Sequence, residues 1–252
     1  MIRTALAALF LTVYTLVLGP PFILYTVLTG HPDPLYRAGI GGVLFIVRLI
    51  GVRIRVEGLE NIPAGVCLFV ANHTSAADAP AVVGAIPRRI SVMAKESLFR
   101  IPIVGQAFHA ARFVPVNRSD RESAIASVEK AISYIREGAS FLIYPEGSRS
   151  NDGRLQAFKK GAFVMAIKAA VPVVPVACSG AHLVMRKREL RLRPGEILVR
   201  FCPPVDASQY TMEQRDALSR RVHAEMAEAL PADQRPLENP LENNETESQE
   251  VV

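Results

Sequence analysis

With 252 residues, half of them hydrophobic, the chain is long enough to bury a full core, which excludes a small scaffold held together by disulfides. Its three cysteines form neither a CxxC pair nor a metal-ligand cluster, and this indicates buried free thiols: Cys67, Cys178 and Cys202. The formal net charge is +5, with −5 in residues 233–252 and +10 in residues 1–232. Such a basic body suits an anionic partner, whether nucleic acid, a membrane surface or a phosphorylated metabolite.

The amino terminus is strongly apolar. Residues 4–29 carry no charge and form a stretch long enough to cross a bilayer, although Pro20 and Pro21 interrupt it near the middle. A second apolar stretch, residues 38–52, is short for a span and contains Arg48. Together the two stretches predict a bent hairpin that lies in one leaflet. A cleavable signal peptide is the alternative, but the run lacks a small-residue cleavage site.

From residue 52 the pattern changes to that of a folded domain. Val52, Ile54 and Val56 alternate with charged residues, which predicts an edge strand with one basic face. Several of the further predicted strands are continuous apolar runs, typical of a sheet that is covered on both faces. These strands are residues 66–71, 90–94, 112–116, 140–144, 173–177 and 197–202.

Helices are predicted between these strands, which indicates an α/β sandwich. The clearest is residues 121–137, with Ser119 or Asp120 as its cap and Gly138 at its end. Four apolar residues share one of its faces: Ile125, Val128, Ile132 and Ile135. Three more helices are expected over residues 76–85, 158–170 and 213–230, and the last has a capping box formed by Thr211 and Gln214.

The chain therefore divides into three predicted regions. Residues 1–51 form a membrane-anchoring helical segment, and residues 52–232 form the folded domain. Residues 233–252 are rich in Glu, Asn, Ser and Pro with few apolar residues, so we expect this acidic tail to be disordered.

The first candidate site stretch begins with Asn72 and His73, at the polar end of the predicted strand 66–71. This is where α/β sheets usually carry chemistry. Asp78 follows His73 by five residues, so it can turn back across a helix start and hold one ring nitrogen, which leaves the other as an oriented proton acceptor. Taken alone, such a pair is more often a capping or hydrogen-bonded histidine.

A second polar stretch follows the apolar run 141–143. It contains Glu146, Gly147, Ser148 and Arg149. Gly147 permits a tight turn that exposes backbone donors, and Arg149 offers a planar fork that suits phosphate oxygens. The alternative is a loop with a surface Glu/Arg pair, since most exposed pairs contribute little.

Two further stretches are weaker on their own. The segment from Lys95 onward ends in a predicted strand that is followed by Asn117 and Arg118, so the strand delivers a cation to its end. A lone arginine there is usually a solvated charge. Residues 171–176 are apolar, and Pro172 is expected to start or edge a strand as part of a core or pocket wall.

Together and in this order, the four stretches resemble the motifs of the glycerolipid acyltransferases over roughly residues 52–205. The first motif, Asn-His, four residues and Asp, is complete. The third, usually Phe-Pro-Glu-Gly-Thr-Arg-Ser, has Tyr144 and Ser148 in place of Phe and Thr. The second departs further, because Arg112 stands where the family tends to have glycine and Asn117 where it has aspartate. This departure leaves the identity of the acceptor open.

The resemblance implies an α/β fold with a mixed, mostly parallel sheet flanked by helices, and an N-terminal membrane-embedded helical hairpin. It implies transfer of a fatty acyl group from acyl-CoA or acyl-carrier protein to the free hydroxyl of lysophosphatidic acid, which yields phosphatidic acid. His73 would be the general base and Asp78 would stabilise the imidazolium, without a covalent acyl-enzyme. No metal or organic cofactor is expected.

The resemblance also implies roles for the remaining residues. The glycerol phosphate is expected to bind to Glu146, Gly147 and Arg149, together with Arg118 and Lys95. Backbone amides near Gly147 or His73 are expected to stabilise the oxyanion. Three residues support the motifs: Asn72, Ser148 and Pro172.

Because the acceptor and product are bilayer lipids, the enzyme is expected to work at a membrane, anchored by residues 1–51. We expect the enzyme on the cytoplasmic face of the membrane, where CoA thioesters are found. In a bacterium the membrane would be the inner one. Four arginines would meet anionic headgroups, each contributing on the order of 1 kcal/mol. They are Arg37, Arg48, Arg53 and Arg55.

Other functions remain open. The acceptor is alternatively a lyso-ornithine lipid, lysophosphatidylglycerol or glycerol 3-phosphate. A serine hydrolase is disfavoured, because there is no GxSxG elbow. A non-enzymatic lipid-binding protein fits the basic body, whereas no stacked aromatic and basic pattern favours nucleic acid.

Overall fold

A seven-stranded sheet organises the described part of the chain, residues 2–117 and 120–237 of this computed structural model. Its strands are β1 (Val52–Glu57), β2 (Leu68–Ala71), β3 (Ser91–Lys95), β4 (Val114–Val116), β5 (Phe141–Ile143), β6 (Val173–Ser179) and β7 (Gly195–Phe201). Their order in space is β1-β7-β6-β2-β5-β3-β4. All neighbours pair in parallel except β6 and β7, so the predicted mostly parallel sheet is confirmed, as is the edge position of β1.

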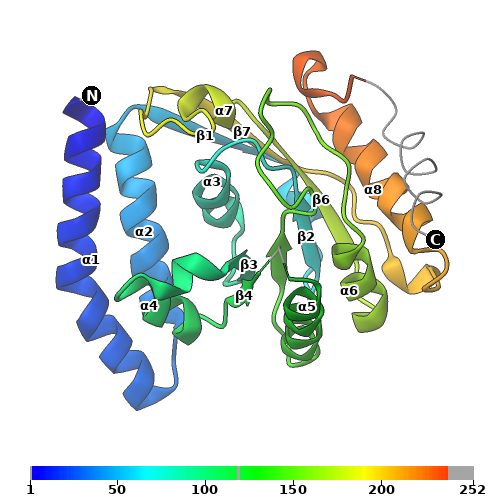
Figure 1. Cartoon of the computed structure of the whole chain (residues 1–252), viewed down its shortest axis with the longest axis horizontal. Helices are drawn as coiled ribbons and strands as arrows, with labels where there is room; N and C mark the ends of the chain where they lie inside the picture. The colour runs from blue at the N-terminus through cyan, green and yellow to red at the C-terminus, as the bar shows by residue number, and fades with distance from the viewer. Residues whose placement is uncertain (1, 118–119, 238–252) are drawn as a thin grey trace.

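Helices cover both faces of this sheet. They are α1 (Ile2–Thr29), α2 (Asp33–Leu49), α3 (Asp78–Ala85), α4 (Val104–Ala110), α5 (Arg121–Arg136), α6 (Gly161–Ala169), α7 (Ala181–Val184) and α8 (Arg215–Ala229). Short 3-10 turns are η1 (Leu59–Asn61), η2 (Glu96–Arg100), η3 (Ala207–Gln209) and η4 (Ala232–Gln234). One face carries α5, α6 and α8, and the other carries α2 and α3, with α1 packed outside α2 (Figure 1).

The strands are buried because their side chains alternate between two cores. In β2, Leu68 and Val70 pack with the helices α5, α6 and α8, whereas Phe69 and Ala71 pack with α2 and α3. All four are fully buried. A strand with helices on both faces needs apolar residues at every position. The continuous apolar runs in the sequence therefore predicted such strands.

Some predicted boundaries differ from the structure. The strand expected from residue 112 begins at Val114, because Arg112 takes a left-handed conformation with φ of 61°. Ile125 lies on α5 as predicted, but it is 54 % exposed and does not belong to the core. Asp120 caps α5, as expected, by accepting hydrogen bonds from the amides of Glu122 and Ser123.

The other three predicted helices are shorter than expected, and the one predicted from residue 76 begins at Asp78. The helix predicted from residue 158 begins at Gly161. In the predicted capping box, the side chain of Gln214 accepts a hydrogen bond from the amide of Thr211 at 3.0 Å, but α8 itself begins only at Arg215.

The two N-terminal helices form a hairpin. α1 is a continuous helix through Pro20 and Pro21, and it bends where these prolines remove backbone hydrogen bonds (Figure 1). The hydroxyl of Tyr14 donates to the carbonyl of Ala38 on α2 at 2.9 Å. Its ring packs on Gly42, where a larger residue would clash. The apolar side chains of α1 that point away from α2 remain exposed.

The first residues of the predicted acidic tail are packed on the folded domain. Asp233 and Gln234 belong to η4, and Gln234 is buried with its carbonyl accepting from the amide of Leu155 at 2.9 Å. Composition cannot reveal such a contact. The rest of the predicted tail, residues 238–252, lies outside the described residues.

Two substitutions in α5 test the assigned core. Ile132 is 2 % exposed, whereas Ile125 is 54 % exposed. We expect Ile132→Ala to lower the free energy of unfolding by about 2–5 kcal/mol, because it removes buried atoms and leaves a cavity. The matched change Ile125→Ala should alter it by less than about 0.5 kcal/mol. Chemical denaturation followed by circular dichroism measures both, and equal losses would contradict this packing.

Candidate active site

The two polar stretches predicted from the sequence meet at the carboxyl ends of two neighbouring parallel strands. His73 follows β2, and Glu146 follows β5. The amide of His73 donates to Oε1 of Glu146 at 2.8 Å, and the amide of Ser150 donates to the carbonyl of His73 at 2.7 Å. The sheet therefore joins segments that are more than seventy residues apart.

The carboxylate of Asp78 is the centre of this arrangement. It is fully buried at the first residue of α3, and its Oδ2 lies 3.0 Å from Nδ1 of His73. The same oxygen accepts from the amides of Thr74 at 2.6 Å and Ser75 at 2.7 Å. Because these partners make the carboxylate an acceptor, we assign the hydrogen of the imidazole to Nδ1, which leaves Nε2 as the acceptor.

Tyr144 holds the imidazole from the side. Its ring centroid lies 4.3 Å from that of His73, with 31° between the ring planes. Burial, together with the nearby Asp78 and Cys178, raises the pKa of Tyr144 well above its usual range, so the phenol stays neutral. The side chain of His73 is 16 % exposed, so a substrate can reach it.

The loop from Asn72 to Asp78 is fastened at both ends. The buried side chain of Asn72 accepts from the amide of Cys178 at 2.7 Å and donates to its carbonyl at 2.9 Å, which ties the end of β2 to β6. The hydroxyl of Ser75 donates to the carbonyl of Met185 at 2.7 Å, beyond α7. Asn72 therefore has a structural role in the motif.

Glu146 points into the protein instead of toward solvent. It is 5 % exposed, and its second oxygen accepts from Nε2 of Gln156 at 2.9 Å. Burial raises the pKa of Glu146 to about 8, against the opposing hydrogen bonds from His73 and Gln156. One oxygen thus holds the loop of His73, and the other holds Gln156. Gln156 was missed in the sequence, where a single glutamine in a loop gives no signal.

Cations gather around the turn at Gly147. This residue has φ of +74°, and the side chain of Lys159 lies over it so closely that an added Cβ would be 2.7 Å from Cε. Lys187 donates through Nζ to the carbonyl of Arg149. Lys159 and Lys187 thus reach the stretch that carries Arg149 from two other segments, and Lys187 was not anticipated.

Other predicted site residues lie elsewhere. Lys95 is exposed at the end of β3, two strands away from β2. Pro172 precedes β6, and its carbonyl accepts from the amide of Leu68, so it lies at the opposite end of the strands from His73. Ser148 is exposed in the turn, and Arg118 lies outside the described residues.

Several backbone amides near His73 and Gly147 have partners within the protein. Those of His73, Thr74 and Ser75 donate to the two carboxyl groups, and that of Gly147 donates to the carbonyl of Tyr144 at 3.2 Å. Buried carboxyl groups need such donors. Stabilisation of the oxyanion by other amides near Gly147 or His73 stays a prediction.

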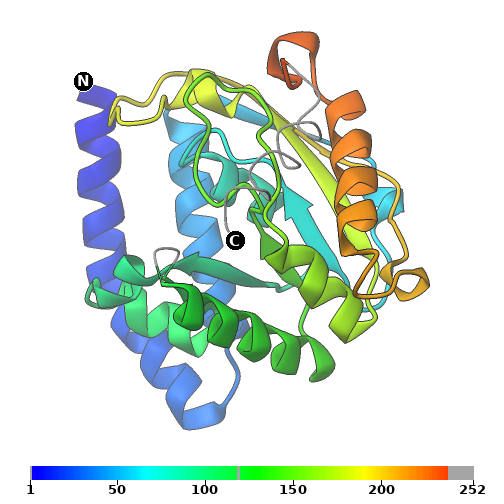
Figure 2. The ribbon, with the colours of Figure 1, turned by 45° about the vertical axis from the view of Figure 1, so that its right-hand side comes forward.

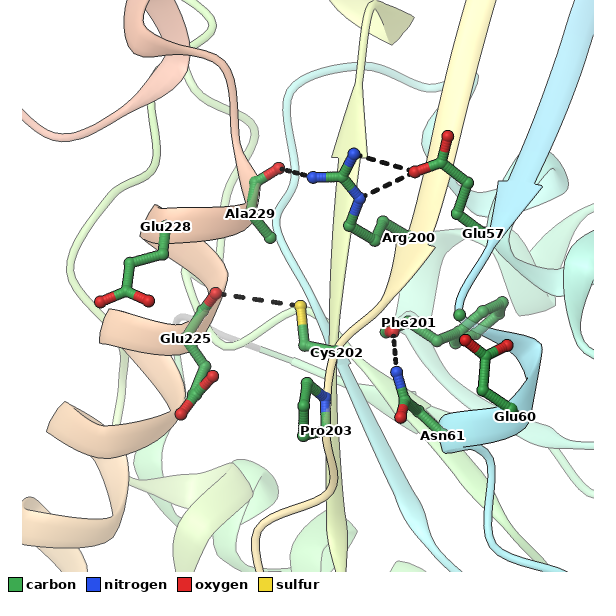
Figure 3. Close-up of a pocket in the computed structure, with 11 residues that line it drawn as sticks. Glu57, Glu60, Asn61, Arg200, Phe201, Cys202, Pro203, Glu225, Glu228 and Ala229 are labelled. Atoms are coloured by element: carbon green, nitrogen blue, oxygen red, sulfur yellow. Dashed lines mark hydrogen bonds and ion pairs between the residues drawn. The ribbon is translucent and has the colours of Figure 1, made fainter.

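A separate open pocket of about 470 Å³ lies between η1, β7 and α8 (Figure 3). Because β7 runs antiparallel to β6, this pocket is at the end of the sheet away from His73. Four carboxylates line it: Glu57, Glu60, Glu225 and Glu228. They disfavour a phosphorylated substrate, although Arg200 pairs with Glu57 at 2.8 Å.

Comparison with known proteins gives consistent matches. The family model described as acyltransferase matches residues 53–179. The 1-acyl-sn-glycerol-3-phosphate acyltransferase of Limnanthes douglasii is 34 % identical over 204 residues, which cover 81 % of this chain and 72 % of that protein. The human protein with this name, form alpha, is 31 % identical over 73 % of this chain and 66 % of its own length.

A solved structure agrees. The crystal structure of the 1-acyl-sn-glycerophosphate (LPA) acyltransferase PlsC from Thermotoga maritima has a TM-score of 0.75 to this chain at 28 % identity. The match covers 89 % of this chain and 93 % of the other.

Substitution of Asn72 tests how the site loop is held. Asn72→Ala leaves the amide and carbonyl of Cys178 unpaired in a buried setting, so we expect the free energy of unfolding to fall by about 2–5 kcal/mol. The control is Asn61→Ala, which removes a single bond to the carbonyl of Phe201 and should cost about 1 kcal/mol. Denaturant titration compares the two. A loss at Asn72 no larger than at Asn61 would contradict the assigned role.

Proposed function

The chain belongs to the acyltransferase family, and we propose that it is a 1-acyl-sn-glycerol-3-phosphate acyltransferase. It transfers a fatty acyl group to the free hydroxyl of lysophosphatidic acid and makes phosphatidic acid. The observation that carries the proposal is the 3.0 Å contact between His73 Nδ1 and Asp78 Oδ2, inside the matched residues 53–179. In such a pair the carboxylate orients the imidazole, so that its other nitrogen can act as a general base.

The reaction follows from this geometry. Nε2 of His73 accepts the proton of the acceptor hydroxyl while its oxygen attacks the thioester carbonyl. Asp78 stabilises the imidazolium that forms. As the tetrahedral intermediate collapses, the carbon–sulfur bond breaks and the imidazolium returns the proton to the departing thiolate. The products are an ester and a free thiol, so no covalent acyl-enzyme is required.

Arg149 and Lys159 are the proposed phosphate ligands. Lys159 lies over Gly147, two residues before Arg149, in the turn whose Glu146 accepts a hydrogen bond from the amide of His73. Charge-assisted hydrogen bonds to phosphate are the stronger kind, and a guanidinium can form two at once. Glu146 and Gly147 contribute by shaping this turn, and Arg118 and Lys95 remain candidates for a more distant part of the substrate.

Membrane attachment is proposed for α1 and α2. α1 has 28 residues with a mean hydropathy of 1.9 in its most apolar window, and only 6 % of that window is buried. It is therefore long and apolar enough to cross a bilayer, but its close packing on α2 and the bend at Pro20 favour a hairpin in one leaflet. We place the domain on the cytoplasmic face, where acyl-CoA and acyl-carrier protein are available.

Replacement of His73 tests the reaction. We expect His73→Ala to lower kcat at least about a hundredfold, because the general base is lost, while the protein still binds lipid vesicles. A non-enzymatic lipid-binding protein would release no CoA with either histidine or alanine at position 73. His109→Ala, an exposed histidine in α4, serves as the matched control and should keep full activity. Release of free CoA from an acyl-CoA donor is the assay.

Replacement of Arg149 tests the acceptor site. We expect Arg149→Ala to raise KM for lysophosphatidic acid by about tenfold to a hundredfold, as a charge-assisted hydrogen bond is worth about 1.5–3 kcal/mol. KM for the acyl donor should change little. Arg154→Ala is the control, because that guanidinium donates to the carbonyl of Arg235.

The same assay decides among acceptors. Wild-type protein that prefers a phosphate-free lysolipid such as a lyso-ornithine lipid, with an Arg149→Ala variant that behaves like the wild type, would refute the assigned acceptor. Preference for glycerol 3-phosphate would do so as well.

A further inference from the structure

The segment after α7, residues 185–194, here called the rim loop, starts at the candidate active site. The carbonyl of Met185 accepts the hydrogen bond of the Ser75 hydroxyl. Lys187 donates to the carbonyl of Arg149. The first residues of the rim loop are therefore fixed to both stretches that carry the catalytic and phosphate-binding side chains.

The far end of the rim loop reaches the anchor. The amide of Leu192 donates to the hydroxyl of Thr4 on α1 at 3.1 Å. Figures 1 and 2 both show this segment running from α7 to the N-terminal end of α1. The rim loop is thus the bridge between the loop of His73 and the apolar helix.

The rim loop is strongly basic. It has five basic residues and a single acidic one, Glu189, which pairs with Arg193 at 2.6 Å. The other three arginines are exposed: Arg186, Arg188 and Arg191. A surface of this charge attracts anionic headgroups.

An exposed leucine lies among these arginines. Leu190 is 82 % exposed, and Leu183, on the preceding α7, is 58 % exposed. The neighbouring end of α1 exposes Ile2, Leu6 and Leu9, so the apolar surface of the anchor continues toward the rim loop. Apolar residues flanked by arginines are typical of segments that lie in the membrane interface.

We propose that the rim loop is a second membrane contact, in which Leu190 enters the headgroup region and Arg186, Arg188 and Arg191 bind anionic phospholipids. This rests on the membrane attachment given under the proposed function. An acidic protein partner would match the charge, but a lipid surface also explains Leu190 and the continuity with α1. The contact would hold the loop of His73 at the level where the acceptor hydroxyl leaves the bilayer.

Site-specific fluorescence tests the contact directly. The three native cysteines, Cys67, Cys178 and Cys202, are buried, so a Leu190→Cys variant of the full chain can be labelled selectively with an environment-sensitive fluorophore. The labelled protein is reconstituted into phosphatidylcholine vesicles with or without phosphatidylglycerol, each containing headgroup-level quencher lipid. Leu59→Cys, an exposed leucine beside the acidic pocket, is the control.

We expect quenching at position 190 but not at position 59, and stronger quenching in the anionic vesicles. Absence of quenching at position 190, or equal quenching at both positions, would overturn the proposal. A label that lipid does not quench but that acidic acyl-carrier protein shields would overturn it in favour of a protein partner.

Activity separates this inference from the proposed function. The variant Arg186→Ser/Arg188→Ser/Arg191→Ser should lose at least about fivefold in rate on a vesicle-embedded acceptor. The reason is that each arginine near an anionic surface strengthens membrane binding by about fivefold. Its rate on a monomeric short-chain acceptor should match that of the wild type. Equal loss on both acceptors would contradict a membrane role.

Wild-type protein that is inactive on both acceptors would refute the acyltransferase function. The fluorescence result would still decide whether the rim loop contacts the membrane.

Discussion

The buried carboxylate of Asp78 is the interaction on which the site depends. A charge removed from water costs several kcal/mol unless hydrogen bonds replace its hydration. Here the amides of Thr74 and Ser75 do so, and Asp78 itself is the first residue of α3, where the helix dipole also favours a negative group. The chain must curl around the carboxylate to deliver them, and this curl places the imidazole of His73 against Oδ2.

The sheet turns this local arrangement into a site. Parallel neighbours β2, β5 and β6 end at the same edge, so the polar residues that follow them meet there. Asn72 ties β2 to β6, and Glu146 ties the β5 turn to the amide of His73. Beyond this turn, the rim loop connects this edge to α1, so the base, the cations and the apolar anchor belong to one connected unit.

Local patterns predicted the parts of the fold that depend on local physics. Burial on both faces made the strands continuous apolar runs, and the five-residue separation of His73 and Asp78 across a helix start implied their contact. Contacts between distant segments were not predictable, because one sequence cannot show which side chains meet. Gln156 on Glu146, the ring of Tyr144 on His73 and Lys187 at Arg149 are of this kind. Which backbone amides the two buried carboxyl groups use also becomes visible only in three dimensions.

Asp78 fixes the tautomer of His73, and nitrogen-15 NMR of histidine-labelled protein tests this most directly. We predict that in the neutral imidazole of His73 the hydrogen is on Nδ1 and Nε2 is bare, and that Asp78→Asn removes this preference while the fold persists. A hydrogen on Nε2 in the wild type, or an unchanged tautomer in Asp78→Asn, would contradict the account.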